Sequence, residues 1–310
     1  MHVFEASTLN QLYLQALHEL LARPCTVPSR NGFTSELHPC VLRLRDLHYR
    51  SLTLRERRKN FGLQLMEFLW IWHGSNRLAP LASVCKQWAA YSDDGVTLHG
   101  AYGSRLRNPS VNGPDQLAQC MTLLQRDPHT RQAVMTIWDP AQDLCSTTKD
   151  KPCNNWLHFM LRNERLDLTV VTRSNDVWWG IPYNVFNWTQ LQCVVAARLG
   201  VEPGVYTHFT DSLHLYEKDR ARALDVVGAN RDGGLCIPWP THGATDEELR
   251  AAYARVTEDG ATTTPQTTFW HHYVGAVRRC QLKQDDAEGL SSPFREEMLL
   301  KQSPLQVGLT

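Results

Sequence analysis

The sequence predicts an α+β fold, and three observations indicate this class. Helix-patterned segments come first, alternating strand-like runs occupy the centre, and further helices are interspersed with those runs. Of the 310 residues, 42% are hydrophobic and 21% charged, values typical of a globular protein with a sizeable core. No internal repeat, low-complexity tract or linker divides the chain, so we expect a single domain over residues 1–310.

Three segments have the apolar spacing and the end signals of helices. A Ser/Thr cap candidate precedes a leucine-rich stretch, a glycine follows a largely apolar stretch, and two prolines bracket a third one. These segments are residues 7–23 with the cap at Ser7 or Thr8, residues 60–74 ending near Gly74, and residues 114–128.

The centre of the chain changes to strand-like alternation. Residues 132–140 and 156–177 have this character, and the second segment contains two runs separated by "RNERL". Residues 186–200 return to helical spacing and end at a glycine, and residues 204–219 suggest a strand leading into a loop. The last thirty residues, 281–310, are polar and weakly patterned, so we expect a tail packed on the surface.

Composition excludes several classes of protein. Lys+Arg and Asp+Glu number 32 each, so net charge predicts neither a nucleic-acid nor a membrane partner. The N-terminus lacks the pattern of a signal peptide, and no run of 18 apolar residues occurs. Nine scattered cysteines without a CxxC pair favour mostly buried free thiols in a reducing cytoplasm and argue against a zinc ribbon. His271 and His272, the only adjacent histidines, have no second ligand pair, so we expect no metal site.

The stretch "TKDKPCNNWLHFML" places Cys153 between a proline and two asparagines. An isolated free cysteine is most often a small buried hydrophobe. Here Pro152 fixes the backbone and polar residues follow, so the thiol lies at the entry of a strand, where a nucleophile could face a pocket.

Twenty residues later, "TRSNDVWWGIPYNVFNW" combines three kinds of polar side chain. As local structure it predicts a strand, a polar turn and then a helix with Asn184 near its N-terminus. Adjacent Arg173 and Ser174 are suited to hold a phosphate, because guanidinium binds oxyanions bidentately. A buried carboxamide presents a donor and an acceptor, enough to recognise the edge of a planar base.

Together, "PCNNW" and "RSNDVWWGIPYN" resemble the thymidylate synthase family, whose signature is a Pro-Cys nucleophile and a downstream R-S-x-D-x-x-x-G-x-P-[FY]-N. The order and spacing of the two halves make the resemblance specific. It extends from about residue 8 to about residue 220. Further matches in family order are Arg30 in "VPSRNG", Glu67 in "LMEFLW", Trp88, Tyr102-Gly103, Arg131 in "DPHTRQAV", and His214 and Tyr216 in "SLHLY".

The resemblance implies a large mixed sheet packed with helices, a homodimer formed through that sheet, and a reaction between a pyrimidine nucleoside monophosphate and 5,10-methylenetetrahydrofolate as co-substrate. Cys153 would add to carbon 6 of the base, with its pKa depressed by Arg173. Glu67, with a raised pKa, would order water and move protons. The other implied roles are catalysis for Tyr102 and Asn154, phosphate binding for Arg30, Arg173, Ser174 and, from the partner subunit, Arg131, sugar binding for His214 and Tyr216, and folate binding for Asp176, Gly180 and Tyr183.

Asn184 indicates which pyrimidine base the site prefers. Uracil shows an acceptor beside an N–H donor, which a carboxamide matches, whereas cytosine suits a carboxyl group better. Cytidylate-modifying members of the family have aspartate at this position, so Asn184 favours a uridylate.

Departures from the family pattern predict which product forms. Asn154 stands where histidine is usual, Gln132 replaces the second arginine after "DPHT", and Cys85 replaces a tryptophan that flanks the intermediate. The usual short apolar C-terminal ending is also missing. A less enclosed site admits water, so we expect hydroxymethylation of deoxyuridylate. The alternatives are thymidylate synthesis, hydroxymethylation of CMP or dCMP, and a catalytically inactive nucleotide-binding relative. A cysteine hydrolase using His158 or His214 is disfavoured, because His158 lies too far along an extended strand from Cys153.

Overall fold

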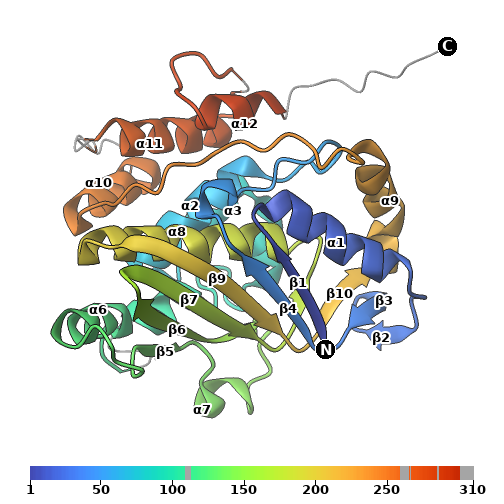
Figure 1. Ribbon diagram of the computed structural model, residues 1–310, viewed down its shortest axis with the longest axis horizontal. Coiled ribbons are helices and arrows are strands. Elements are labelled where there is room, and N and C mark those ends of the chain that lie inside the picture. Colours follow the sequence, from blue (N-terminus) through green and yellow to red (C-terminus); the bar gives the residue numbers. More distant parts are fainter. Residues whose placement is uncertain (109–112, 259–264, 266, 285, 301–310) are drawn as a thin grey trace.

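The computed structural model describes residues 1–108, 113–258, 265, 267–284 and 286–300, and Figure 1 shows their arrangement. Two β-sheets lie beneath a stack of helices. The larger sheet has the strand order β1-β4-β9-β7-β6-β5 and the smaller one β2-β3-β10-β8. The strands are β1 His2–Ala6, β2 Val27–Ser29, β3 Gly32–Leu37, β4 Cys40–Leu44, β5 Val134–Thr136, β6 Asn154–Arg162, β7 Arg165–Thr172, β8 Asn175–Asp176, β9 Glu202–Thr210 and β10 Leu213–Tyr216.

The larger sheet mixes parallel and antiparallel pairs, as the resemblance implies. β1 runs parallel to β4 and β7 runs parallel to β9, whereas β4–β9, β6–β7 and β5–β6 are antiparallel. The expected pair of strands around "RNERL" is confirmed as the β6–β7 hairpin. Asn163 and Glu164 close it with φ of 52° and 59°, the positive values of a tight two-residue turn.

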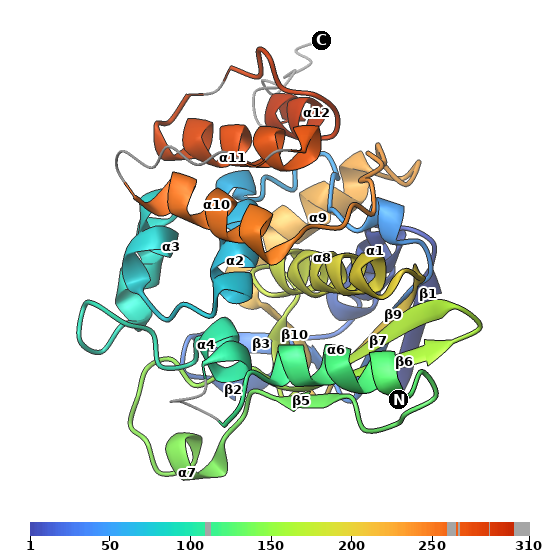
Figure 2. The ribbon, with the colours of Figure 1, turned by 90° about the vertical axis from the view of Figure 1, so that its left-hand side faces the viewer.

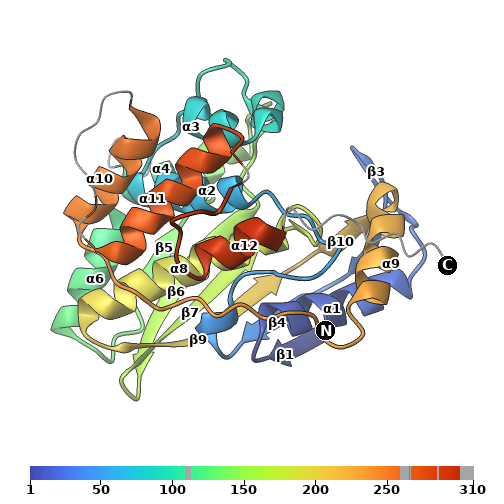
Figure 3. The same cartoon turned by 90° about the horizontal axis from the view of Figure 1, so that it is seen from above.

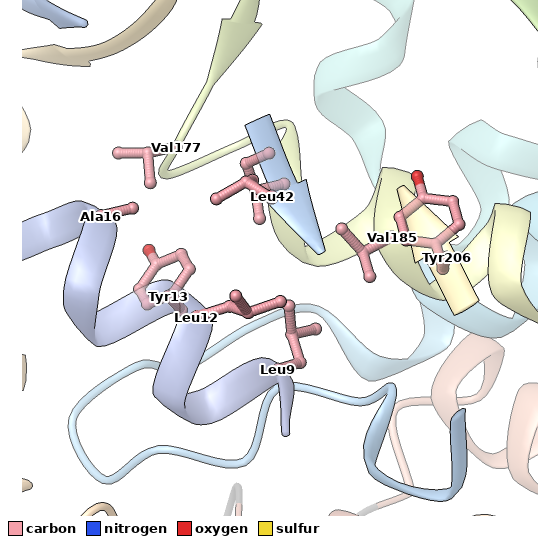
Figure 4. Close-up of a pocket in the computed structure, with 9 residues that line it drawn as sticks. Leu9, Leu12, Tyr13, Ala16, Leu42, Val177, Val185 and Tyr206 are labelled. Atoms are coloured by element: carbon pink, nitrogen blue, oxygen red, sulfur yellow. The ribbon is translucent and has the colours of Figure 1, made fainter. Parts of the chain in front are cut away.

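Helices α1 (Leu9–Leu21) and α8 (Ile181–Leu199) pack against one face of the larger sheet. Thr8 caps α1 by accepting a hydrogen bond from Gln11 N, and Gly200 ends α8 at φ 70°. Between α1, β4 and α8 lies a small pocket lined by apolar side chains and two tyrosines (Figure 4). No charged side chain lines it, so it belongs to the core.

The remaining helices cover the edges of the sheets and the upper side of α8 (Figure 2). Helix α2 is buried almost throughout and ends at Gly74 with φ 73°, as the sequence predicts. The bounds are α2 Phe61–His73, α3 Leu78–Val84, α4 Tyr102–Arg107, α6 Gln116–Arg126, α7 Pro140–Asp143, α9 Arg220–Ala229, α10 Asp246–Thr257, α11 Thr268–Gln281 and α12 Phe294–Leu300, with short 3₁₀ turns at Leu47–Tyr49, Lys86–Tyr91 and Glu217–Asp219.

Helices α10, α11 and α12 form a layer over α2, which Figure 3 shows from above and which we call the C-terminal layer. In its described part, the tail that the sequence predicts to pack on the surface ends in helix α12. Phe294 and Met298 of α12 are fully buried, because they stand one helical turn apart on a face that meets the core. Residues 301–310 lie outside the described residues.

The predicted order of elements needs two further corrections. Strand β1 precedes the first helix, and β2, β3 and β4 follow it, so helices do not come first. Strands β1 and β2 are short and have no fully buried residue, which leaves a weak alternation in the sequence. The loop expected after residue 210 contains β10, which pairs with β3 and β8 in the smaller sheet.

Candidate active site

Cys153 lies directly before β6, at the entry of the strand as predicted, and it is half-buried. Because β6 and β7 are antiparallel, the end of β7 returns to the same place and delivers Arg173. The Arg173 backbone N–H donates to Cys153 O at 3.0 Å, and its guanidinium Nη2 lies 3.7 Å from the Cys153 Sγ. The two motifs that are separate in the sequence therefore meet in space.

The pKa of the Cys153 thiol is raised, chiefly by burial. Arg173 and Arg30 favour the thiolate, but nearby Asp150 and Asp176 oppose them. Arg173 lowers this pKa as expected, but desolvation outweighs the attraction of its guanidinium, so the net shift is upward. The resting thiol is protonated.

Glu67 lies on α2 and is only 5% exposed. Burial raises the pKa of its carboxyl to about 7, and a hydrogen bond from Asn187 opposes the rise. Asn187 Nδ2 donates to Glu67 Oε2 at 2.7 Å. A carboxyl group with this pKa can hold or release a proton near neutral pH, which is what a general acid or base requires.

Tyr102 and Asn154 lie beside both of these groups. Burial raises the pKa of the Tyr102 hydroxyl well above its usual range, and the charges of Cys153 and Glu67 contribute to that rise. Asn154 is fully buried, and its Oδ1 accepts a hydrogen bond from Trp188 Nε1 at 3.1 Å. Since the Trp188 ring centroid lies 5.8 Å from that of Tyr102, these residues form one cluster around the thiol.

The nucleotide-binding candidates lie on three different elements. Ser174 follows Arg173 between β7 and β8, and Asn184 lies in the first turn of α8 with 8% exposure. His214 and Tyr216 alternate on β10, where their rings meet edge-on at 5.2 Å, and burial lowers the pKa of His214.

Asp176, Gly180 and Tyr183 connect β8 to α8. Burial raises the pKa of Asp176 to about 6, although its Oδ1 accepts the Trp178 backbone N–H at 2.7 Å. A Cβ atom on Gly180 would lie 1.9 Å from Asn175 Oδ1, so the chain turns here only with glycine. The Tyr183 hydroxyl accepts the Asn60 backbone N–H at 2.9 Å.

The two remaining arginines differ in position. Arg30, exposed in the β2–β3 turn, is close enough for its charge to act on Cys153. Arg131 is exposed near β5, which pairs with β6 so that Val134 faces His158. The His158 side chain is hydrogen-bonded to the Arg131 backbone, which puts Arg131 roughly 17 Å along β6 from Cys153, outside the site of its own subunit.

Residues 11–229 match the sequence profile described as thymidylate synthase. The chain belongs to the thymidylate synthase family. It is 36% identical to a deoxyuridylate hydroxymethyltransferase of Bacillus phage SP01, over 97% of this chain and 80% of that protein. It is 34% identical to a protein of the same name from Pseudomonas phage M6, over 77% and 69%. The thymidylate synthase of phage T4 has the same fold, with a TM-score of 0.60, 21% identity, and coverage of 69% of this chain and 79% of that one.

The family profile ends before the C-terminal layer, whereas the SP01 relative aligns with nearly the whole chain. The layer also contacts the site region. Glu297 of α12 forms an ion pair with Lys59 at 2.7 Å, in the loop that leads into α2, and Trp239 Nε1 donates to Glu297 Oε1 at 2.5 Å.

Sequence reasoning missed three residues of the site. Asn187 and Trp188 contact Glu67 and Asn154, and their spacing from Asn184 on an apolar helix is a signal that could have identified them. Tyr91 has no such signal. The charges of Cys153, Asp176 and Tyr216 contribute to the raised pKa of its hydroxyl, so it lies near the entrance of the site.

The described residues contain no group of three or more His, Cys, Asp or Glu side chains arranged to hold a metal ion. No helix among them is long and apolar enough to span a membrane. All nine cysteines are free, but only Cys40, Cys120 and Cys193 are fully buried, fewer than expected. Arg173 is hydrogen-bonded to the Cys153 thiol, and neither His158 nor His214 is, so the site lacks the thiol–histidine pair of a cysteine hydrolase.

Proposed function

We propose that this enzyme transfers a hydroxymethyl group to carbon 5 of deoxyuridylate, using 5,10-methylenetetrahydrofolate as co-substrate. The observation that carries the proposal is the contact of the Cys153 thiol with Arg173, beside a Tyr102 hydroxyl that interacts electrostatically with both Cys153 and the buried Glu67. The free thiols and a nucleoside monophosphate substrate suit the cytoplasm.

Binding of the nucleotide follows from charge and hydrogen-bonding capacity. Arg30, Arg173 and Ser174 hold the phosphate, whose negative charge their side chains match. His214 and Tyr216 bind the sugar hydroxyl. The Asn184 carboxamide pairs with the N–H and carbonyl of uracil, and a cytosine there would leave buried polar groups unpaired.

Cys153 then adds to carbon 6 of the base and makes carbon 5 nucleophilic. Because the resting thiol is protonated, it must lose its proton as the nucleotide arrives, and Arg173 at 3.7 Å stabilises the thiolate. Glu67 exchanges protons with the base through water. Tyr102 and Asn154 provide polar side-chain groups beside the sulfur.

The residues between β8 and α8 fit a reduced folate. Asp176 presents a carboxyl group with a pKa near 6, suited to the pterin ring, and the adjacent Trp179 is 42% exposed and free to stack. Gly180 and Tyr183 shape the turn on which these groups stand. When bound, the folate supplies a one-carbon unit at the oxidation level of formaldehyde.

Addition of water rather than hydride completes the proposed reaction. Two relatives that are named as deoxyuridylate hydroxymethyltransferases support this product. Cys85 supports it too, because it is a small half-buried side chain that contributes electrostatically to the raised pKa of Tyr183. A tryptophan at that place would close the wall against water. Methylation to thymidylate is the second candidate, favoured by the fold shared with the phage T4 enzyme.

We also propose a homodimer formed through the larger sheet. Helices α1 and α8 cover one face, and the other carries a row of half-buried Trp156, Val171 and Phe209 from three adjacent strands. A second copy on that face would bury the row, and its Arg131 would complete the phosphate site, which the Arg131 of the same subunit is too distant to reach.

Mass analysis of the product in ¹⁸O-labelled water tests the function. With deoxyuridylate and methylenetetrahydrofolate, we expect a hydroxymethyl product carrying ¹⁸O, with tetrahydrofolate released. A methylated product with dihydrofolate would establish the second candidate. No product from deoxyuridylate, deoxycytidylate or their ribose forms would leave a binding protein. The Cys153→Ala variant is the control and should be inactive.

A further inference from the structure

One turn of α8 carries three side chains that reach different parts of the site. Asn184 is the residue proposed above to bind the base, Asn187 donates to Glu67, and Trp188 donates to Asn154 beside the nucleophile. The family pattern accounts for Asn184. Nothing in that pattern accounts for Asn187.

Asn187 is almost fully buried, at 2% exposure, and only half of its carboxamide has a partner. Nδ2 donates to Glu67 Oε2 at 2.7 Å, whereas Oδ1 has no hydrogen-bond donor among the residues that the structure describes. A buried acceptor without a donor is costly, so such an atom in a reaction site points to a missing group that donates to it.

The same carboxamide is also the side chain that holds the acid–base residue. Glu67 has one side-chain hydrogen bond, to Asn187, in the described part of the chain. A carboxamide complements both protonation states of a carboxyl group, because its nitrogen donates to the carboxylate and its oxygen accepts from the acid.

We propose that Asn187 is a positioning residue that holds the Glu67 carboxyl group and, through Oδ1, the water molecule that adds to the nucleotide. This rests on the hydroxymethylase function proposed above. The water donates one hydrogen bond to Asn187 Oδ1 and the other to Glu67, which places its oxygen lone pair towards the base.

The step balances without an oxidant. The water oxygen bonds to the exocyclic methylene carbon on the base, its proton passes to Glu67, and the electron pair moves to the oxygen on carbon 4. Return of that pair forms the carbon 5–carbon 6 double bond, breaks the sulfur–carbon 6 bond and releases the Cys153 thiolate. One hydrogen from carbon 5 and one from water equal the two hydrogens that the released tetrahydrofolate gains.

The contact can be tested without substrates, by following the carboxyl C=O band of Glu67 by infrared spectroscopy against pH. Subtraction of Glu67→Gln isolates the band. The titratable groups that face Glu67 are Tyr102 of α4 and Tyr183 of α8, and burial raises the pKa of both phenols, so they stay neutral. Loss of the Asn187 donor in Asn187→Leu should move the Glu67 midpoint upward by roughly one pH unit.

Gln192→Leu is the matched control. Gln192 is another fully buried carboxamide of α8 with an unpartnered oxygen, but its Nε2 donates to Leu166 O at 2.7 Å, away from the site. It should leave the midpoint unchanged. Should Asn187→Leu not fold, Asn187→Ser, a smaller residue with a hydroxyl, is expected to show a smaller upward shift.

Kinetics complete the test. We expect Asn187→Leu to lower kcat at least tenfold, with calorimetric affinity for deoxyuridylate within about threefold of wild type. Loss of nucleotide affinity would show that Asn187 contacts the base and would overturn the inference. An unmoved midpoint in both Asn187 variants would overturn it while the wild-type product still established the function. A wild-type enzyme without hydroxymethyl product would refute the function and the water role, and the infrared titration would still test the Glu67 contact.

Discussion

At the scale of single residues, Glu67 couples the chemistry to stability. Its carboxyl group has a pKa near 7 in the folded chain, against about 4.5 when exposed. Between these values the folded protein holds a proton that the unfolded chain releases, so stability is full below about pH 4.5 and falls as pH rises through 7.

This predicts that Glu67→Gln gains stability relative to wild type as pH increases. The difference in free energy of unfolding between variant and wild type should grow by roughly 3 kcal/mol from pH 4.5 to pH 8. Urea denaturation of both proteins at several pH values measures it. A difference that stays flat with pH would show that the Glu67 pKa is ordinary.

Cys85 offers a test of how water reaches the base. We expect Cys85→Trp to raise the methylated fraction of the product, because an indole beside Tyr183 would displace water from that wall. The ratio of methyl to hydroxymethyl product by mass spectrometry is the measurement. Cys145→Trp, at an exposed cysteine, is the control and should keep the wild-type ratio.

Several site residues could be predicted from the sequence, and others could not. Cys153, Arg173 and Asn184 were predicted from motif spacing, and the hairpin brings the first two together. The direction of the Cys153 pKa shift was not predictable, because it depends on how desolvation compares with the charges of Asp150 and Asp176. Both the desolvation of the thiol and its distances to these charges depend on packing that no local sequence pattern encodes.

At the scale of elements, the C-terminal layer depends on a buried ion pair. The side chains of Lys59 and Glu297 are 8% and 1% exposed, and Trp239 also bonds Glu297. Removing one partner would leave a charge buried without compensation.

Glu297→Ala should therefore lower the free energy of unfolding by about 3 to 5 kcal/mol. Asp232→Ala is the control. It also removes the carboxylate of an ion pair, because Asp232 pairs with Arg55 at 2.6 Å, but the side chains of Arg55 and Asp232 are 52% and 65% exposed. It should cost much less than Glu297→Ala, because water and salt screen an exposed pair. Equal effects in thermal or urea unfolding would contradict the structural importance of the buried pair.

The sequence predicted long elements better than short ones. Helices α1, α2 and α8 have strong apolar spacing and recognisable ends, whereas β1, β2 and α12 are stabilised by contacts with distant segments. The helix within the tail was not predicted for this reason. Seven residues of α12 show little pattern, and their burial depends on a core formed by the rest of the chain.

At the scale of the whole molecule, the proposed dimer predicts that two inactive variants restore each other. Arg131→Ala removes the arginine that reaches the neighbouring site, and Cys153→Ala removes the nucleophile. A mixed dimer has one site in which both residues are intact, so an equal mixture after subunit exchange should recover roughly a quarter of wild-type activity. Activity that stays near zero after confirmed exchange would place both residues in one subunit's site.

The buried pair between Lys59 and Glu297 also has a consequence for the nascent chain. Lys59 emerges from the ribosome long before its partner, because Glu297 lies far along the chain on α12. Until α12 has been synthesised, Lys59 in the loop before α2 lacks the carboxylate of Glu297. Helix α2, which carries Glu67, therefore cannot complete its packing. Chains that terminate before α12 should therefore remain recognisable to chaperones and proteases.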